Sequence, residues 1–189
     1  MCNQIKTVAF DLGGVLAYQD LDLLTEEELM LFRVYMNRND ILDKELIDYA
    51  HKRMIEIYLK IYKLTSEAIL TFEMLNDLKI RLSIWTNNIQ EIDNWFEEVH
   101  LYQYIKRENI INSFYIGVDK PNLAFYLRAL ELLGDMPQEI LFLDDHLENV
   151  EGAKRLEINS KIYNIDDSLS EVVQFEIKKG GYYENNSVR

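Results

Sequence analysis

Short apolar runs alternate with segments of helical periodicity over most of this chain. The apolar runs predict buried β-strands at Ile5–Phe10, Ile80–Trp85, Ile110–Ile116, Ile140–Leu143 and Lys161–Asn164. Helical spacing between these runs predicts helices over residues 65–79, 89–99, 121–133 and 148–156. Such alternation is typical of an α/β fold, with a parallel sheet whose strands are joined by right-handed crossovers.

The stretch between the first two strands, residues 15–64, is too long for a simple crossover. Thr25 begins a capping-box sequence, and apolar residues between 42 and 64 recur at three- and four-residue spacing. We therefore expect a separate helical insertion at this point of the chain.

The second periodic stretch of this insertion contains Tyr49, Tyr58 and Tyr62, which could line a binding surface or fill the core. Tyrosine at such positions is more often a core residue with a wet hydroxyl, so we favour the core role. His51 lies off the apolar face, and we expect it to be solvated.

The composition narrows the possible classes of function. The 189 residues are 48% apolar, which is enough for a sizeable core, and they carry a formal net charge of −13. An acidic surface repels nucleic-acid backbones and anionic lipid, so we expect no nucleic-acid partner and no membrane partner. An anionic substrate would need local positive charge, together with a bound cation.

The single cysteine excludes a disulfide framework or a cysteine-rich zinc site within the chain. No long apolar segment indicates a leader or a membrane span. We therefore expect a cytoplasmic protein that is either a monomer or a homodimer.

Polar side chains follow four of the five predicted strands. Asp11 follows the first strand, Thr86-Asn87 the second, Lys120 the third and Asp144-Asp145 the fourth. If the sheet is parallel, these strand ends share one edge, where ligands bind in open α/β sheets. Each cluster alone could be a turn or a helix cap, but four clusters at four strand ends favour a single site.

These residue types suit phosphoryl transfer. Several carboxylates close together require a cation, and oxygen ligands with room for water suit Mg²⁺. Asp11 could then act as the nucleophile on phosphorus. Thr86 and Lys120 would stabilise the negative charge of the phosphoryl group as it transfers.

The four clusters, in this order, resemble the motifs of the haloacid dehalogenase (HAD) superfamily of hydrolases. The first motif is residues 10–16, Phe-Asp-Leu-Gly-Gly-Val-Leu, the second is Thr86-Asn87-Asn88 and the third is Lys120-Pro121. The fourth and most specific motif is residues 141–154, which contain the double Asp. The resemblance covers most of the chain.

The resemblance implies a fold and a division into two parts. Residues 1–14 and 65–189 would form a core built on a Rossmann-like parallel sheet flanked by helices. Residues 15–64 would form a small all-helical cap, inserted after the first strand and lying over the active site.

The resemblance also implies a role for each motif residue, in a Mg²⁺-dependent hydrolysis of a small phosphorylated metabolite, with sugar phosphates as candidates. Asp11 corresponds to the nucleophile, which forms an aspartyl-phosphate. The residues expected to hold Mg²⁺ are Asp11, the carbonyl group of Gly13, Asp145 and Asp144, with Asn149 in support. The residues expected to hold the phosphate group are Thr86, Asn87 and Lys120.

One departure from the family pattern concerns the catalytic acid. Most phosphatases of the superfamily have a second Asp two residues after the nucleophile, where this chain has Gly13. A positioned acid contributes roughly a hundred- to ten-thousand-fold in rate. The Asp-Leu-Gly variant also occurs in a subgroup that includes sugar-phosphate phosphatases, so we expect slow or selective activity, favouring leaving groups that need little protonation.

A second departure follows the fourth motif, where the family often has Gly and this chain has Glu157. If the backbone is left-handed there, Glu costs on the order of 1 kcal/mol. The departure therefore bears on stability and leaves the chemistry alone.

Two other functions stay open. A metal-independent haloacid dehalogenase would leave other roles to Lys120 and the double Asp. A non-catalytic protein could keep the site for binding or regulation, because Gly13 removes the acid. The sequence does not determine the substrate, although Tyr18 and Gln19, which follow the first motif, are candidates by position.

Overall fold

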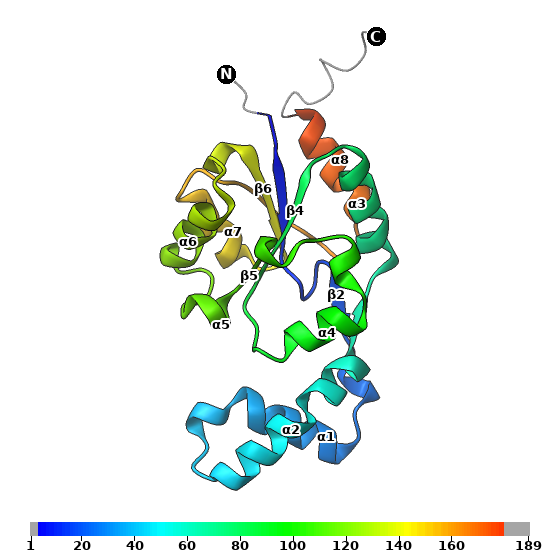
Figure 1. The fold of residues 1–189 in the computed structure, drawn as a ribbon, viewed down its shortest axis with the longest axis vertical. Coiled ribbons are helices and arrows are strands. Elements are labelled where there is room, and N and C mark those ends of the chain that lie inside the picture. Colours follow the sequence, from blue (N-terminus) through cyan, green and yellow to red (C-terminus); the bar gives the residue numbers. More distant parts are fainter. Residues whose placement is uncertain (1–3, 180–189) are drawn as a thin grey trace.

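The structure of the protein, a computed structural model, describes residues 4–179 (Figure 1). Its centre is a parallel five-stranded sheet in the order β5-β4-β1-β6-β7. The strands are β1 (Thr7–Phe10), β4 (Arg81–Thr86), β5 (Ile110–Asn112), β6 (Ile140–Asp144) and β7 (Asn159–Ile162). Each overlaps one of the five predicted strands, so the α/β fold class is confirmed.

Helices cover both faces of this sheet (Figure 1). On one face lie α3 (Ser66–Asp77) and α8 (Leu169–Lys179), and on the other lie α6 (Leu123–Leu133) and α7 (Leu147–Lys154). The remaining core helices are α4 (Ile92–Glu98) and α5 (Ser113–Ile116). We did not predict α8. Within residues 4–179, no helix is both long enough and apolar enough to span a membrane.

Alternate residues of the strands belong to two apolar clusters, one on each face of the sheet. Val8 and Phe10 of β1 belong to the cluster that includes α3 and α8. Ala9 of β1, Trp85 of β4 and Phe142 of β6 belong to the cluster that includes α6 and α7. Burial on both faces explains why these strands read as continuous apolar runs in the sequence.

The segment between β1 and α3 contains a helical pair, on the side of the carboxyl ends of the strands (Figure 1). Its helices α1 (Glu26–Met36) and α2 (Lys44–Ile61) pack together, and the predicted capping box at Thr25 is present. The segment also contains two strands, β2 (Ala17–Gln19) and β3 (Tyr62–Leu64), which pair antiparallel. The expectation of a purely helical segment missed them, because three residues are too few to display a period of two.

The structure also contains five short 3₁₀ helices, which we did not predict. They span Leu21–Leu23, Arg38–Asp40, Leu101–Gln103, Arg107–Asn109 and Pro137–Glu139.

The third strand is shorter than predicted, and this changes the place of Lys120. β5 ends at Asn112, whose side chain accepts a hydrogen bond from the Phe114 amide (3.1 Å) and so starts α5. Lys120 therefore lies in the loop after α5 and not at the end of a strand. α6 then begins at Leu123, two residues after Pro121, with Asn122 as its N-cap.

Glu157 has a left-handed backbone with φ of 61°. Its carboxylate accepts a hydrogen bond from Gln138 (2.6 Å). The left-handed backbone expected to strain a glutamate is therefore present at Glu157, and this strain lowers the stability of the folded state.

Candidate active site

The carboxyl ends of three adjacent strands meet at one pocket of about 480 Å³. Asp11 directly follows β1, Thr86 is the last residue of β4, and Asp144 is the last residue of β6. The residues that line the pocket are Asp11, Gly13, Gly14, Gln19, Tyr62, Thr86, Asn87, Asn88, Lys120, Pro121, Asp145, His146, Glu148 and Asn149. The parallel register thus brings together residues that are far apart in the sequence.

Lys120 reaches the centre of the site although it follows no strand. Its ammonium group lies 2.9 Å from Oδ1 of Asp11 and 2.7 Å from Oδ2 of Asp144. It also donates to the carbonyl oxygen of Trp85 (2.7 Å). These three acceptors account for the three N–H donors of an ammonium group. The buried lysine therefore links the ends of all three strands.

Asp144 is completely buried and fully held by its neighbours. Besides the contact with Lys120, both oxygens of its carboxylate accept from Nδ2 of Asn149 (3.0 Å each). Its Oδ1 also accepts from the backbone amide of His146 (2.9 Å). Asn149 thus fixes Asp144, and its support of a metal site stays a prediction. Asp144 holds Lys120 in place, and this contact was not predicted.

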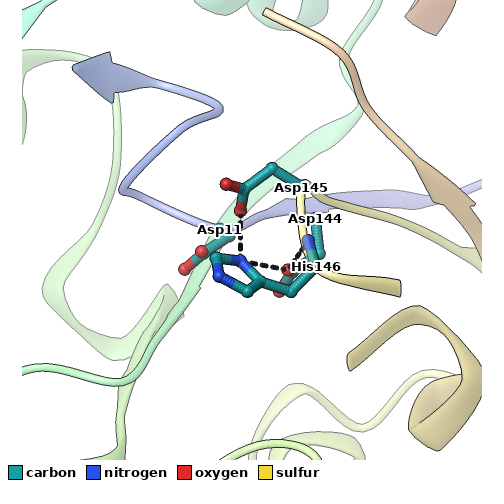
Figure 2. A group of neighbouring side chains, drawn as sticks. All are labelled: Asp11, Asp144, Asp145 and His146. Carbon is teal, nitrogen blue, oxygen red and sulfur yellow. Dashed lines mark hydrogen bonds and ion pairs between the residues drawn. The ribbon is translucent and has the colours of Figure 1, made fainter. Parts of the chain in front are cut away.

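Asp145 is more open than Asp144 and lies beside His146 (Figure 2). Oδ1 of Asp145 is 2.8 Å from Nδ1 of His146. A Cβ on Gly14 would collide with the carboxylate of Asp145, and Gly14 has a left-handed φ of 74°. Only glycine lets this carboxylate approach the chain that follows Asp11 so closely.

These side chains fit a divalent cation. One potential ligand atom from each of Asp11, Asp144, Asp145 and His146 lies within 4.8 Å of the others. Carboxylate oxygens are the preferred ligands of hard cations such as Mg²⁺ and Ca²⁺, and the pocket leaves room for water. Asp11 and Asp145 are the better candidates, because the oxygens of Asp144 are occupied by Lys120 and Asn149.

Burial controls the protonation of Asp11. The loss of hydration, helped by the negative charge of Asp144, raises the pKa of its carboxyl group to about 6 against the opposing effect of Lys120. The hydrogen bond to Asp145 raises the pKa of His146 above its ordinary value. A bound cation would favour the ionised form of Asp11.

Thr86 and Asn87 occupy different positions in the site. Thr86 is buried and lines the pocket beside Asp11. The side chain of Asn87 instead binds the backbone of Lys120, donating to its carbonyl oxygen (2.9 Å) and accepting from its amide (2.8 Å). Asn87 also lines the pocket, so its expected contact with phosphate stays a prediction, while its side chain positions Lys120.

Two lining residues, Gln19 and Tyr62, were left as open candidates by the sequence. Tyr62 was expected to be a core residue with a wet hydroxyl, and it packs against the apolar core but also lines the pocket. Tyr58 is buried as expected. Gln19 lines the pocket, but its neighbour Tyr18 does not. His51 is half-exposed and is ion-paired with a glutamate. Strand alternation at residues 17–19 would have separated Tyr18 from Gln19, had that strand been recognised.

A family model now identifies the chain. The model of the haloacid dehalogenase-like hydrolases matches residues 24–157, which is more than half of the sequence. The chain belongs to this family. The matched range contains Thr86, Lys120 and the double Asp, whereas Asp11 and Gly13 precede it.

Two curated proteins are similar in sequence to parts of this chain. Phosphoglycolate phosphatase from Aquifex aeolicus is 25% identical over 174 residues, covering 80% of this chain and 81% of that protein. Drimenol cyclase from Aspergillus calidoustus is 31% identical over 62 residues, which span 33% of this chain and only 12% of that protein.

Two solved structures share the fold at low sequence identity. A HAD-like family hydrolase from Porphyromonas gingivalis has a TM-score of 0.72 at 18% identity, covering 93% of this chain and 99% of that one. A HAD family enzyme from Bacteroides thetaiotaomicron, in complex with magnesium and inorganic phosphate, has a TM-score of 0.64 at 18% identity, covering 89% and 98%.

Proposed function

We propose that this hydrolase is a Mg²⁺-dependent phosphatase that acts on a small phosphorylated metabolite through an aspartyl-phosphate on Asp11. The observation that carries the proposal is the meeting of Asp11, Asp145 and Lys120 in one pocket. The Aquifex relative is named a phosphatase, and the Bacteroides structure holds magnesium and phosphate together. Both names support the same class of reaction.

In the first step, an oxygen of Asp11 attacks phosphorus, and the bond from phosphorus to the leaving-group oxygen breaks. The charge of Lys120, 2.9 Å from Asp11, keeps the nucleophile ionised and offsets charge that spreads over the phosphoryl oxygens. Thr86 would donate its hydroxyl to the phosphoryl group from the end of β4. The leaving group takes a proton from water, because Gly13 has no acidic side chain that could donate one.

In the second step, water attacks phosphorus, the bond between phosphorus and Asp11 breaks, and inorganic phosphate leaves. The proton of this water passes to solvent, because Gly13 offers no carboxylate that could take it. The aspartyl-phosphate should therefore be long-lived, and turnover should be slow unless the leaving group is already a good one.

Asp11, the carbonyl group of Gly13 and Asp145 would hold the Mg²⁺, with Asp144 and Asn149 fixing the surrounding side chains. The ion, when bound, would neutralise negative charge on the transferring phosphoryl group. Residues 15–64 would act as the cap, because Gln19 and Tyr62 from this segment line the pocket beside residues of the core.

Metal dependence and the Asp11→Asn variant separate this function from its alternatives. We expect acetyl phosphate and para-nitrophenyl phosphate to be hydrolysed with Mg²⁺, and this activity to be lost with EDTA and in Asp11→Asn. Halide release without metal would support the dehalogenase. Failure to hydrolyse any phosphate ester, with binding retained, would support a non-catalytic role.

A further inference from the structure

Two paired strands bring polar side chains to the pocket from the cap segment. Gln19 of β2 and Tyr62 of β3 are directly opposite each other in the antiparallel register. Opposite residues of such a pair lie on the same face, and both residues line the pocket that contains Asp11. Tyr18 alternates to the other face, is 46% exposed and does not line the pocket.

The aromatic ring of Tyr62 is held in place by its neighbours. Its centroid lies 5.0 Å from that of Tyr58 and 5.8 Å from that of Trp95, which also donates to the Tyr62 carbonyl (3.3 Å). Burial raises the pKa of the Tyr62 hydroxyl to about 12, so the hydroxyl stays protonated and can donate a hydrogen bond. The group is thus a fixed, neutral donor and acceptor at the pocket.

Asn88 is the polar neighbour of the Tyr62 hydroxyl. Its amide oxygen accepts from the backbone of Ile89 (3.0 Å) and from the hydroxyl of Tyr58 (3.4 Å). These contacts fix the amide in one orientation. Gln19, Tyr62 and Asn88 therefore form a neutral polar wall of the pocket, which we call the polar wall.

The charge around this wall is negative. Three acidic side chains line the pocket, Asp11, Asp145 and Glu148, against the basic Lys120 and His146. All three donors of Lys120 are used by protein acceptors, and His146 is paired with Asp145. With buried Asp144 included, a divalent cation and a phosphate dianion would leave the site negative, even if His146 is protonated.

We propose that the polar wall binds the leaving group of the substrate, and that it selects a neutral, hydroxyl-bearing leaving group over a carboxylated one. The inference rests on the proposed phosphatase function and names its substrate class. Hydroxyl groups can exchange hydrogen bonds with all three residues of the polar wall. A carboxylate would enter a negative field, and the described residues that line the pocket offer it no unpaired cation.

A matched pair of phosphate esters tests this preference. Glycerol 3-phosphate and 3-phosphoglycerate differ in bearing a hydroxymethyl group or a carboxylate at the carbon farthest from the phosphate. We expect Asp11→Asn with Mg²⁺ to bind the first at least about tenfold more tightly by calorimetry, and wild type to show the same preference in kcat/KM. Equal binding, tighter binding of the carboxylated ester, or binding of neither would overturn the inference.

Variants of the polar wall test whether its residues cause the preference for glycerol 3-phosphate over 3-phosphoglycerate. Gln19→Arg should reduce the ratio of the two kcat/KM values about tenfold, because it adds a cation where a carboxylate would lie. Tyr62→Phe should raise KM for glycerol 3-phosphate about three- to tenfold, with a smaller effect on kcat. Tyr18→Phe, on the opposite face of β2, is the matched control and should leave the ratio unchanged.

The outcomes keep the two proposals apart. Discrimination in binding without hydrolysis of acetyl phosphate would contradict the phosphatase function and leave the subsite standing. Hydrolysis of acetyl phosphate without discrimination between the esters would support the phosphatase function and contradict the subsite. A ratio unchanged in both Gln19→Arg and Tyr62→Phe would overturn the assignment of the subsite to these residues.

Discussion

The ammonium group of Lys120 lies 2.9 Å from the carboxylate of Asp11, at the centre of the candidate active site. The same group lies 2.7 Å from Asp144, so one buried cation serves two buried anions. Breaking a buried ion pair by removing one partner typically costs about 3–5 kcal/mol, because the other charge stays buried and unpaired. We therefore expect Lys120 to contribute to folding as well as to the proposed chemistry.

Replacement of this lysine tests both contributions. Lys120→Met keeps the side-chain length and removes the charge, so Asp11 and Asp144 would repel each other. We expect the free energy of unfolding to fall by about 3 kcal/mol or more and the turnover of acetyl phosphate to fall at least about a hundredfold. Urea unfolding and steady-state kinetics measure the two effects.

Lys154→Met is the matched control for this variant. Lys154 is half-exposed on α7 and paired with Glu151 (2.8 Å), so its loss should change the unfolding free energy by less than about 1 kcal/mol. If Lys120→Met were as stable and as active as Lys154→Met, the central role of Lys120 would be wrong.

The raised pKa of Asp11 predicts a pH-dependent cost in stability. In the unfolded chain this carboxyl group has an ordinary pKa near 3.8, and in the folded metal-free protein it is about 6. Because the folded-state pKa is the higher one, ionisation destabilises the fold. The cost is absent below about pH 4, grows as the pH rises and is complete above about pH 6. The shift corresponds to up to about 3 kcal/mol.

Asp11→Asn should therefore stabilise the metal-free protein at pH 8 but not at pH 4. Thermal unfolding in EDTA at both pH values measures this difference. Asp48→Asn, an exposed position on α2, is the control and should give the same small change at both. A midpoint for Asp11→Asn that lies below wild type at pH 8 would contradict the assignment of a strained, desolvated carboxylate.

Gly13 offers a test by gain of function. A Cβ at this position would meet no atom within 4 Å, and the backbone is not left-handed, so a Cβ fits there without strain. We expect Gly13→Asp to raise kcat/KM for unactivated alkyl phosphates about a hundredfold, because it restores an acid near the leaving group. Acetyl phosphate, which needs little protonation, should gain much less.

Gly13→Asn adds nearly the same volume without an ionisable group, and it should give no gain. Equal losses with the alkyl phosphate and with acetyl phosphate in Gly13→Asp would argue against a missing acid as the reason for the expected slow turnover. The comparison therefore separates acid catalysis from crowding of the pocket.

The left-handed backbone of Glu157 predicts a gain in stability from glycine. Glu157→Gly relieves the strain but also loses the hydrogen bond with Gln138, so Glu157→Ala, which loses only the bond, is the reference. We expect the glycine variant to be more stable than the alanine variant by about 1 kcal/mol in urea unfolding. A glycine variant that is no more stable than the alanine variant would show that the position carries no backbone strain.

The sheet and much of the site were predictable because both depend on buried strands. The runs at β1, β4 and β6 are apolar on both faces, and each is followed by the polar residues that meet in the pocket. Asp11, Thr86 and the double Asp were therefore placed by the parallel register alone. The family resemblance added Gly13 and Asn149 as candidates.

The rest of the site depends on contacts that leave no periodic signal. Lys120 was expected at a strand end, yet it is placed by Asn87, which binds its backbone from the end of β4. Tyr62 continues the helical spacing of α2, but the helix ends at Ile61 and the tyrosine turns into β3. The pairing of Tyr62 with Gln19 joins residues far apart in the sequence, and no local pattern encodes it.

The proposed aspartyl-phosphate on Asp11 can be measured directly. Since glycine replaces the base that would speed its hydrolysis, the adduct should accumulate when wild type and Mg²⁺ are mixed with acetyl phosphate and quenched in acid. Mass spectrometry should then find one phosphoryl group on the peptide that contains Asp11, absent with EDTA and absent in Asp11→Asn. A peptide that stays unmodified while acetyl phosphate is consumed, or a phosphoryl group on another residue, would contradict the account.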